Sequence, residues 1–137
     1  MGIVLDSSIL VAFERRRFDL ERLLTDHSPP AIAAVTAAEL LIGVERADTA
    51  ERRNRRAEFV QNIFDRVPII PFDLPQARFY AIHFAELAAR GQIIGDRDLQ
   101  IAVTALCVGY DLATLNENEF GRVTGLRLVD VTTYRIV

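Results

Sequence analysis

Three acidic residues far apart in the chain lie where strands are predicted to end or helices to begin. Asp6 follows the apolar run at residues 3–5, Glu39 lies one turn into a predicted helix, and Asp98 begins another after Gly95. Carboxylates gathered in one place repel one another, and a bound divalent cation removes that repulsion. Because the chain has only two histidines and one cysteine, oxygen ligands favour Mg²⁺, or alternatively Mn²⁺, over zinc.

Each of these acids also has a purely structural explanation. Asp6 suits a helix N-cap, Glu39 suits the acidic position of a capping box with Thr36, and Asp98 suits the positive end of a helix dipole. Taken singly, Asp6 and Glu39 favour that explanation. All three, however, fall at junctions that a parallel sheet brings to one edge. We interpret them together as a metal site suited to phosphoryl chemistry, where the cation activates water and stabilises the leaving oxygen.

Alternating strands and helices are predicted to position these acids. Such alternation indicates an α/β fold with a mostly parallel sheet covered on both faces, which binds ligands beyond the carboxyl ends of its strands. The apolar pattern predicts strands at 2–5, 32–35, 67–72, 112–115 and 126–131 and helices at about 8–15, 18–26, 36–46, 49–65, 75–90 and 98–109.

Composition limits the classes of function that the chain can serve. Its 137 residues fit one domain, and a net charge of −3 counts mildly against a sequence-reading DNA binder. It does not count against a nuclease, because bound cations invert the local field. The sequence lacks a signal peptide and any apolar run of roughly 20 residues that would span a membrane. We therefore expect a cytoplasmic protein without a membrane partner.

All 16 basic residues are arginine. The absence of lysine argues against a phosphoacceptor signalling domain and a nucleotide-binding P-loop, both of which require one. A phosphatase of the haloacid-dehalogenase type would need an aspartate where Ser8 stands. The arginine clusters at 15–17 and 52–56 are typical of solvated helix faces, and contact with an RNA backbone is the functional alternative.

Four segments in order resemble the motifs of PIN-domain toxins of the VapBC type: IVLDSS, VTAAELLIGV, IIGDRDLQIAVTAL and ATLNENEFGRVTGL. The resemblance covers nearly the whole chain. It implies that residues 1–137 form a single PIN domain, a three-layer α/β/α fold around a mostly parallel five-stranded sheet. It also implies an Mg²⁺-dependent endoribonuclease that acts on RNA, forms a homodimer or a higher toxin–antitoxin assembly, and is inhibited by a cognate antitoxin through a groove formed by the early helices.

The resemblance also assigns residues to the site. Asp6, Glu39 and Asp98 correspond to the family's metal-binding acids. Ser8 corresponds to the small polar residue of the first motif, and Thr36 to the hydroxyl of the second.

The fourth motif departs from the family pattern. Asn116 stands where the family often has aspartate, and Glu119 is the alternative source of the missing carboxylate, which leaves a second metal position open. Thr114 is expected either to orient a ligand or to be an ordinary strand residue. Asp96 is expected to support the site, with helix capping as its alternative role.

The resulting hypothesis is that Asp6, Glu39 and Asp98 hold one cation, and that water attacks an RNA phosphodiester in line to leave a 5′-phosphate and a 3′-hydroxyl. The departure at Asn116 supports one alternative, a catalytically weak PIN fold that acts only as a binding or regulatory protein.

Overall fold

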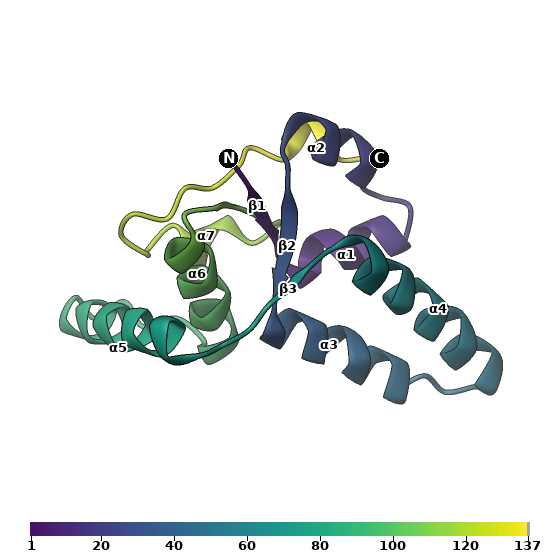
Figure 1. Ribbon diagram of the computed structural model, residues 1–137, viewed down its shortest axis with the longest axis horizontal. Coiled ribbons are helices and arrows are strands. Elements are labelled where there is room, and N and C mark those ends of the chain that lie inside the picture. The colour runs from purple at the N-terminus through teal and green to yellow at the C-terminus, as the bar shows by residue number, and fades with distance from the viewer. Residues whose placement is uncertain (137) are drawn as a thin grey trace.

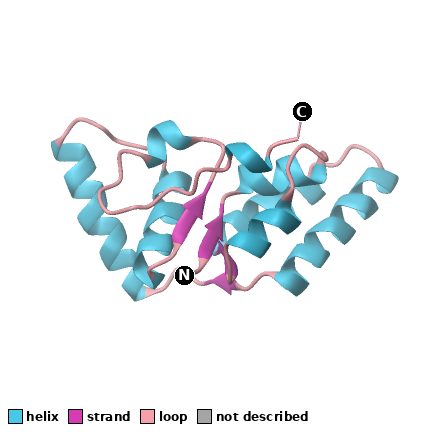
Figure 2. Cartoon of the chain, turned by 90° about the horizontal axis from the view of Figure 1, so that it is seen from above, coloured by secondary structure: helices cyan, strands magenta, loops and turns pink. Residues whose placement is uncertain are grey.

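The computed structural model describes residues 1–136, in which a parallel sheet lies between two layers of helices (Figure 2). The sheet has the strand order β3-β2-β1-β4, and every neighbouring pair of strands is parallel. The α/β class and the mostly parallel sheet are therefore as predicted. The strands are β1 (Ile3–Leu5), β2 (Pro30–Ala33), β3 (Ile69–Ile70) and β4 (Asp111–Ala113).

The helices divide between the two faces of the sheet (Figure 1). Helices α1 to α4 cover one face, and α5 and α6 pack against each other on the opposite face. None of the helices in residues 1–136 has the length and apolar character needed to cross a membrane. The helices are α1 (Ser7–Glu14), α2 (Leu20–Asp26), α3 (Ala34–Glu45), α4 (Ala50–Arg66), α5 (Leu74–Ala89), α6 (Asp96–Val108), α7 (Glu117–Phe120) and the 3₁₀ helix η1 (Thr132–Tyr134).

The central strand β1 contributes to a separate core on each face. Ile3 and Leu5 pack with the core of the α1–α4 layer, and Val4 packs with that of the α5–α6 layer; all three are fully buried. In β4, Ala113 and Leu112 divide between the same two cores. Successive strand residues point to opposite faces, and here both faces are covered, so the strands read as uninterrupted apolar runs.

The sheet has four strands within residues 1–136, and the prediction of five was wrong. The predicted strand at 126–131 forms only an isolated parallel bridge between Leu128 and Leu112. The amide of Leu112 donates to the carbonyl of Arg127 at 2.9 Å, and that of Val129 donates to the carbonyl of Leu112 at 2.9 Å. The apolar pattern reflects burial of Val129 and Val131 rather than an extended ladder.

Prolines shorten another predicted strand. Residues 67–72 were predicted as a strand tolerant of proline only if short or at an edge, and β3 is both, being two residues long and last in the sheet. Pro68 and Pro71 flank it and lack the amide that a longer ladder needs.

The C-terminal segment packs against the turn between α1 and α2. Phe18 and Arg135 form an antiparallel bridge, and the amide of Ile136 donates to the carbonyl of Arg17 at 2.9 Å. The amide of Asp19 donates to the carbonyl of Tyr134 at 2.7 Å. These bonds fix residues 134–136 beside the end of α1.

Two glycines provide a test of the helix assignments. Gly109 ends α6, as predicted, and adopts the left-handed conformation at φ 71°. Gly43 lies inside α3, where an added methyl group would make only ordinary contact with the Arg56 side chain. Gly109→Ala should lower the free energy of unfolding by roughly 1 kcal/mol, because an L-residue is strained there. Gly43→Ala should raise it by about 0.5–1 kcal/mol, because alanine favours a helix interior. Urea denaturation of both variants measures the two changes, and equal signs would contradict the assignment.

Candidate metal centre

Asp6 lies at the carboxyl end of the central strand, between β2 and β4. Its amide donates to the carbonyl of Ala113 at 3.0 Å, which ties it to the end of β4, and the residue is only 6% exposed. Strand order reverses about β1, since β2 and β3 lie on one side and β4 on the other. The site therefore forms at the position where such sheets bind ligands.

The Asp6 carboxylate is held by two hydroxyl groups rather than by the helix that it precedes. Asp6 occupies the N-cap position of α1 but makes no side-chain cap bond. Its Oδ2 accepts hydrogen bonds from Ser8 Oγ at 2.8 Å and Thr114 Oγ1 at 2.7 Å. The N-cap explanation thus accounts for the position of the residue but not for its carboxylate. Oδ1 has only a 3.5 Å contact with Ser7 Oγ and is the oxygen free to bind a cation.

The direction of these two hydrogen bonds is fixed by the loop after β4. Ser8 Oγ accepts from the amide of Leu115 at 3.0 Å, and Thr114 Oγ1 accepts from the amide of Asn116 at 3.0 Å. Each hydroxyl has one proton, so each accepts from the backbone and donates to Asp6. This network holds the carboxylate in one orientation.

Glu39 faces the same site from the middle of α3. Its side chain is 23% exposed, and its Oε2 lies 3.5 Å from Ser7 Oγ and 3.6 Å from a guanidinium nitrogen of Arg97. Burial raises the pKa of Glu39; the charge of Arg97 opposes that rise, and the charge of Asp6 adds to it. Asp6 and Glu39 are therefore close enough to repel each other.

The predicted capping box of Thr36 and Glu39 is wrong. Helix α3 begins at Ala34, two residues earlier than expected, and its N-cap is Ala33. Thr36 is instead the third residue of the helix, fully buried, and its Oγ1 has no hydrogen-bond partner within residues 1–136. An unpaired buried hydroxyl is unusual. It lies three residues before Glu39, on the same side of α3.

Asp98 and Glu119 complete the acidic group. Asp98 is the third residue of α6 rather than its first, and Glu119 lies on α7. Burial raises the pKa of Asp98 to about 7, helped by a hydrogen bond shared with Glu119 and by the charges of Asp6, Glu119 and Glu39. The charges of Asp6, Glu39 and Glu119 therefore all act on Asp98, and that of Asp6 also acts on Glu39, which places the four carboxyl groups near one another.

This donor set suits a hard cation but does not form a finished cage. Across the described residues 1–136, no three acidic, histidine or cysteine side chains lie close enough together to hold one ion as they stand. Glu39 is turned toward Arg97, and Asp98 is bonded to Glu119. A cation bound here would supply the neutralising charge beside Glu39 that Arg97 now supplies, and would offset the repulsion that raises the pKa of Asp98.

The other predicted residues lie at varying distances from this group. Asp96 accepts a hydrogen bond from Tyr80 at 2.5 Å, which joins α5 to α6, and one from Gln100 at 3.1 Å within α6. Asp96 is not among the groups that shift the pKa of Asp98 or of Glu39. Asn116 is the N-cap residue of α7 without a side-chain cap bond.

Two residues of the site were missed by the sequence reasoning. Ser7 contacts both Asp6 and Glu39, and Arg97 is the cation that faces Glu39. The signal for Arg97 was its place between two acids in the segment Gly95–Asp98. Ser7 had no signal separate from its neighbour Ser8.

Comparison with known proteins identifies the family. The PIN domain family model matches residues 3–126. The chain belongs to the PIN-domain family. Ribonuclease VapC1 of Rickettsia felis is 32% identical over 97% of this chain and 98% of its own length. The tRNA(fMet)-specific endonuclease VapC of Shigella flexneri is 31% identical over 95% of this chain and 98% of its own length.

Solved structures agree with this assignment. A chain in the crystal structure of VapBC2 from Rickettsia felis, bound to a DNA fragment from its promoter, superposes with a TM-score of 0.81 at 29% identity. The superposition covers 94% of this PIN domain and 98% of that chain. Ribonucleases of this family depend on a metal ion, which the acidic group of Asp6, Glu39, Asp98 and Glu119 is suited to bind.

The hydroxyl network around Asp6 leads to the first prediction for this site. Thr114→Val removes a buried donor to Asp6 and leaves the amide of Asn116 without its acceptor, so the free energy of unfolding should fall by about 1–3 kcal/mol. The control is Thr25→Val, where an exposed hydroxyl donates to the Glu21 carbonyl and the change should stay within about 0.5 kcal/mol. Equal losses in the two variants, measured by urea denaturation, would contradict the network.

The raised pKa of Asp98 leads to the second. The pKa of Asp98 is about 7 in the folded protein and has an ordinary value of 3.8. The protonated carboxyl group therefore contributes its full stabilisation of the folded state below about pH 4, and this contribution is lost as pH rises through 7. In chelator, wild-type stability should therefore fall between pH 5 and 7.5. Asp98→Asn should lack most of this fall, since its amide cannot titrate. Urea denaturation at several pH values measures the free energy of unfolding of both proteins. A fall of the same size in the two would contradict the assignment of the raised pKa to Asp98.

Proposed function

We propose that this protein is the endoribonuclease toxin of a type II toxin–antitoxin pair and that Asp6, Glu39 and Asp98 hold its catalytic Mg²⁺. The observation that carries the proposal is the convergence of four carboxyl groups on the carboxyl edge of the sheet in a PIN domain. Relatives over nearly the full chain named as VapC ribonucleases support the reaction class. Residues 1–137 then form a single PIN domain.

The chain's own groups divide the work. Asp6 offers Oδ1 to the ion while Ser8 and Thr114 hold Oδ2. Glu39 and Asp98 approach from α3 and α6. Bound there, a divalent cation polarises a water molecule and neutralises charge on the phosphate.

Glu119 is the best candidate for the fourth carboxylate. It shares a hydrogen bond with Asp98, whereas the Asn116 side chain makes no hydrogen bond within the described residues. With Asp98 holding the ion, Glu119 would lie beside it and could accept a proton from water. Asn116 then has a secondary role toward the water shell or a weaker second ion. The products are a 5′-phosphate and a 3′-hydroxyl.

RNA and a cognate antitoxin are the proposed partners, and a homodimer is the proposed assembly. The VapBC crystal structures to which this chain is similar support the antitoxin. The Shigella relative is named for cleavage of an initiator transfer RNA, which makes a structured transfer RNA the first substrate to test.

Asp6→Asn tests the proposal while retaining the shape of the side chain. With Mg²⁺ present, purified wild-type protein freed from antitoxin should cleave RNA, and chelation should stop cleavage. Asp6→Asn should cut roughly 100-fold more slowly or worse, because the preorganised negative oxygen is lost. Gel-resolved cleavage of end-labelled transfer RNA measures the rate.

Asp111→Asn is the matched control, since Asp111 lies at the opposite end of β4 in an exposed pair with Arg127. Its cleavage rate should remain near that of the wild type. Cleavage that persists in chelator, or an Asp6→Asn variant that cuts at the wild-type rate, would contradict the metal mechanism. A folded wild-type protein that binds antitoxin but cuts no RNA would favour the alternative of a non-catalytic binding protein.

A further inference from the structure

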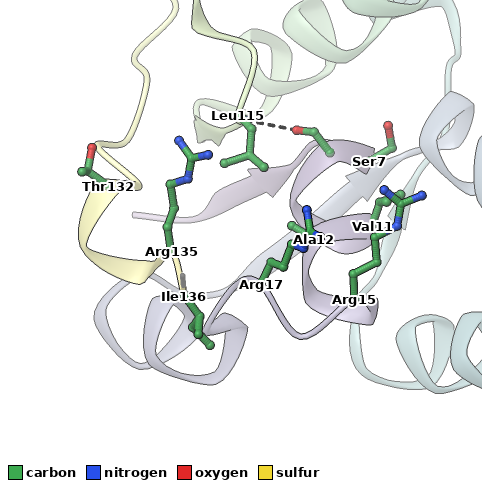
Figure 3. A pocket seen from close by; sticks show the side chains of 10 residues that line it. Ser7, Val11, Ala12, Arg15, Arg17, Leu115, Thr132, Arg135 and Ile136 are labelled. Carbon is green, nitrogen blue, oxygen red and sulfur yellow. Dashed lines mark hydrogen bonds between the residues drawn. The ribbon is translucent and has the colours of Figure 1, made fainter.

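A hollow of about 940 Å³ lies beside the candidate metal centre, between α1 and the C-terminal segment (Figure 3). Arg15 and Arg17 border it at the end of α1, and Arg135 borders it from the C-terminal side. In Figure 3 the guanidinium group of Arg135 lies beside Leu115, while those of Arg17 and Arg15 reach toward Ala12 and Val11 of α1. The backbone bonds of residues 134–136 to the α1–α2 turn hold these arginines together.

The charge of this hollow is of one sign. No aspartate or glutamate lines it, and within residues 1–136 none of Arg15, Arg17 and Arg135 forms an ion pair. Seven other arginines are paired with carboxylates, as Arg52 is with Asp48 at 2.8 Å. The positive charge around the hollow is therefore available to an external anion.

The hollow is continuous with the catalytic network. Ser7 and Ser8 form part of its wall, and Ser8 donates to the Asp6 carboxylate. A second, polar hollow is lined by Thr114 and Asn116 and again by Arg135. Arg135 thus stands between two hollows that both reach the residues around Asp6.

The rest of the lining limits the chemistry of the occupant. Val11, Ala12, Leu115 and Ile136 give the hollow an apolar floor that suits the face of a ribose or base. It has no aromatic side chain on which bases would stack. Recognition here would therefore depend on charge, and the fitting ligand is a polyanion with apolar faces.

We propose that this hollow is the subsite that binds the RNA strand adjoining the scissile phosphodiester, with Arg15, Arg17 and Arg135 contacting its phosphates. The inference rests on the proposed ribonuclease function and adds the direction in which the bound RNA runs. The strand leaves the metal centre over α1 toward the C-terminal segment. The groove on the other side of α1 has mixed charge, because Glu14 lines it together with Arg15 and Arg56, so it suits a polyanion less well.

The test removes the three charges together, as Arg15→Ala, Arg17→Ala and Arg135→Ala in one protein. The control removes three other unpaired arginines, as Arg16→Ala, Arg46→Ala and Arg78→Ala, none of which lines the hollow. Both variants lose the same net charge from exposed positions. Thermal unfolding and far-UV circular dichroism confirm that each variant is folded, and binding to the purified cognate antitoxin is measured as a separate readout.

Steady-state cleavage and salt-dependent binding of a fluorescent single-stranded RNA are then compared. The hollow variant should show a KM raised about tenfold or more with kcat within about twofold, and its slope of log Kd against log salt should fall by about 2, as expected for three lost phosphate contacts. The control variant should match the wild type in KM and in salt slope. Among the single variants Arg15→Ala, Arg17→Ala and Arg135→Ala, the last should raise KM most.

The possible failures are distinguishable. If wild-type protein cuts RNA but the hollow variant has an unchanged KM and salt slope, the subsite is wrong and the proposed function stands. If the hollow variant binds RNA normally but loses antitoxin binding, the hollow serves a protein partner and the proposal is overturned. If the wild-type protein cuts no RNA, the proposed function itself fails.

Discussion

The repulsion among carboxylates at the carboxyl edge of the sheet is the constraint on which the site depends. Asp6, Glu39, Asp98 and Glu119 come from four different elements, and burial removes the water that would screen them. Carboxylates in such surroundings keep protons or acquire a counter-charge. Here burial and the neighbouring charges raise the pKa of Asp98, and Arg97 faces Glu39. A bound divalent cation would neutralise these carboxylates more fully.

Much of this arrangement could be predicted from the sequence. Short apolar runs followed by polar residues located β1, β2 and β4, and Pro68 and Pro71 correctly restricted β3 to a short edge strand. The rule that parallel strands present their carboxyl ends at one edge brought Asp6, Glu39 and Asp98 to a common site. Those inferences depend on local patterns and on chain order alone.

The rest depended on contacts between segments distant in the sequence. The apolar pattern at 126–131 indicated that these residues are buried. It could not show that Leu128 alone would pair with the sheet. The motif of Thr36 and Glu39 fitted a capping box, but the helix begins at Ala34, so neither side chain caps it. Thr114 could be assigned either of two roles until its bond with Asp6, 108 residues away, was located. The assignment of the metal ligands remains a prediction.

A net charge of −3 conceals a separation of charge on this surface. The acidic group lies beside a hollow whose charged residues are all arginines, and Ser7 and Ser8 connect the two. Such an arrangement suits a polyanionic substrate that needs a cation at one phosphate and fixed positive charge along its neighbours. The central claim is that the acidic group binds a divalent metal ion. Titration of the protein with Mn²⁺, followed by the electron paramagnetic resonance signal of the free ion, tests it most directly. Wild-type protein should bind the ion saturably and Asp6→Asn much more weakly; equal binding by the two proteins, or none by the wild type, would contradict the account.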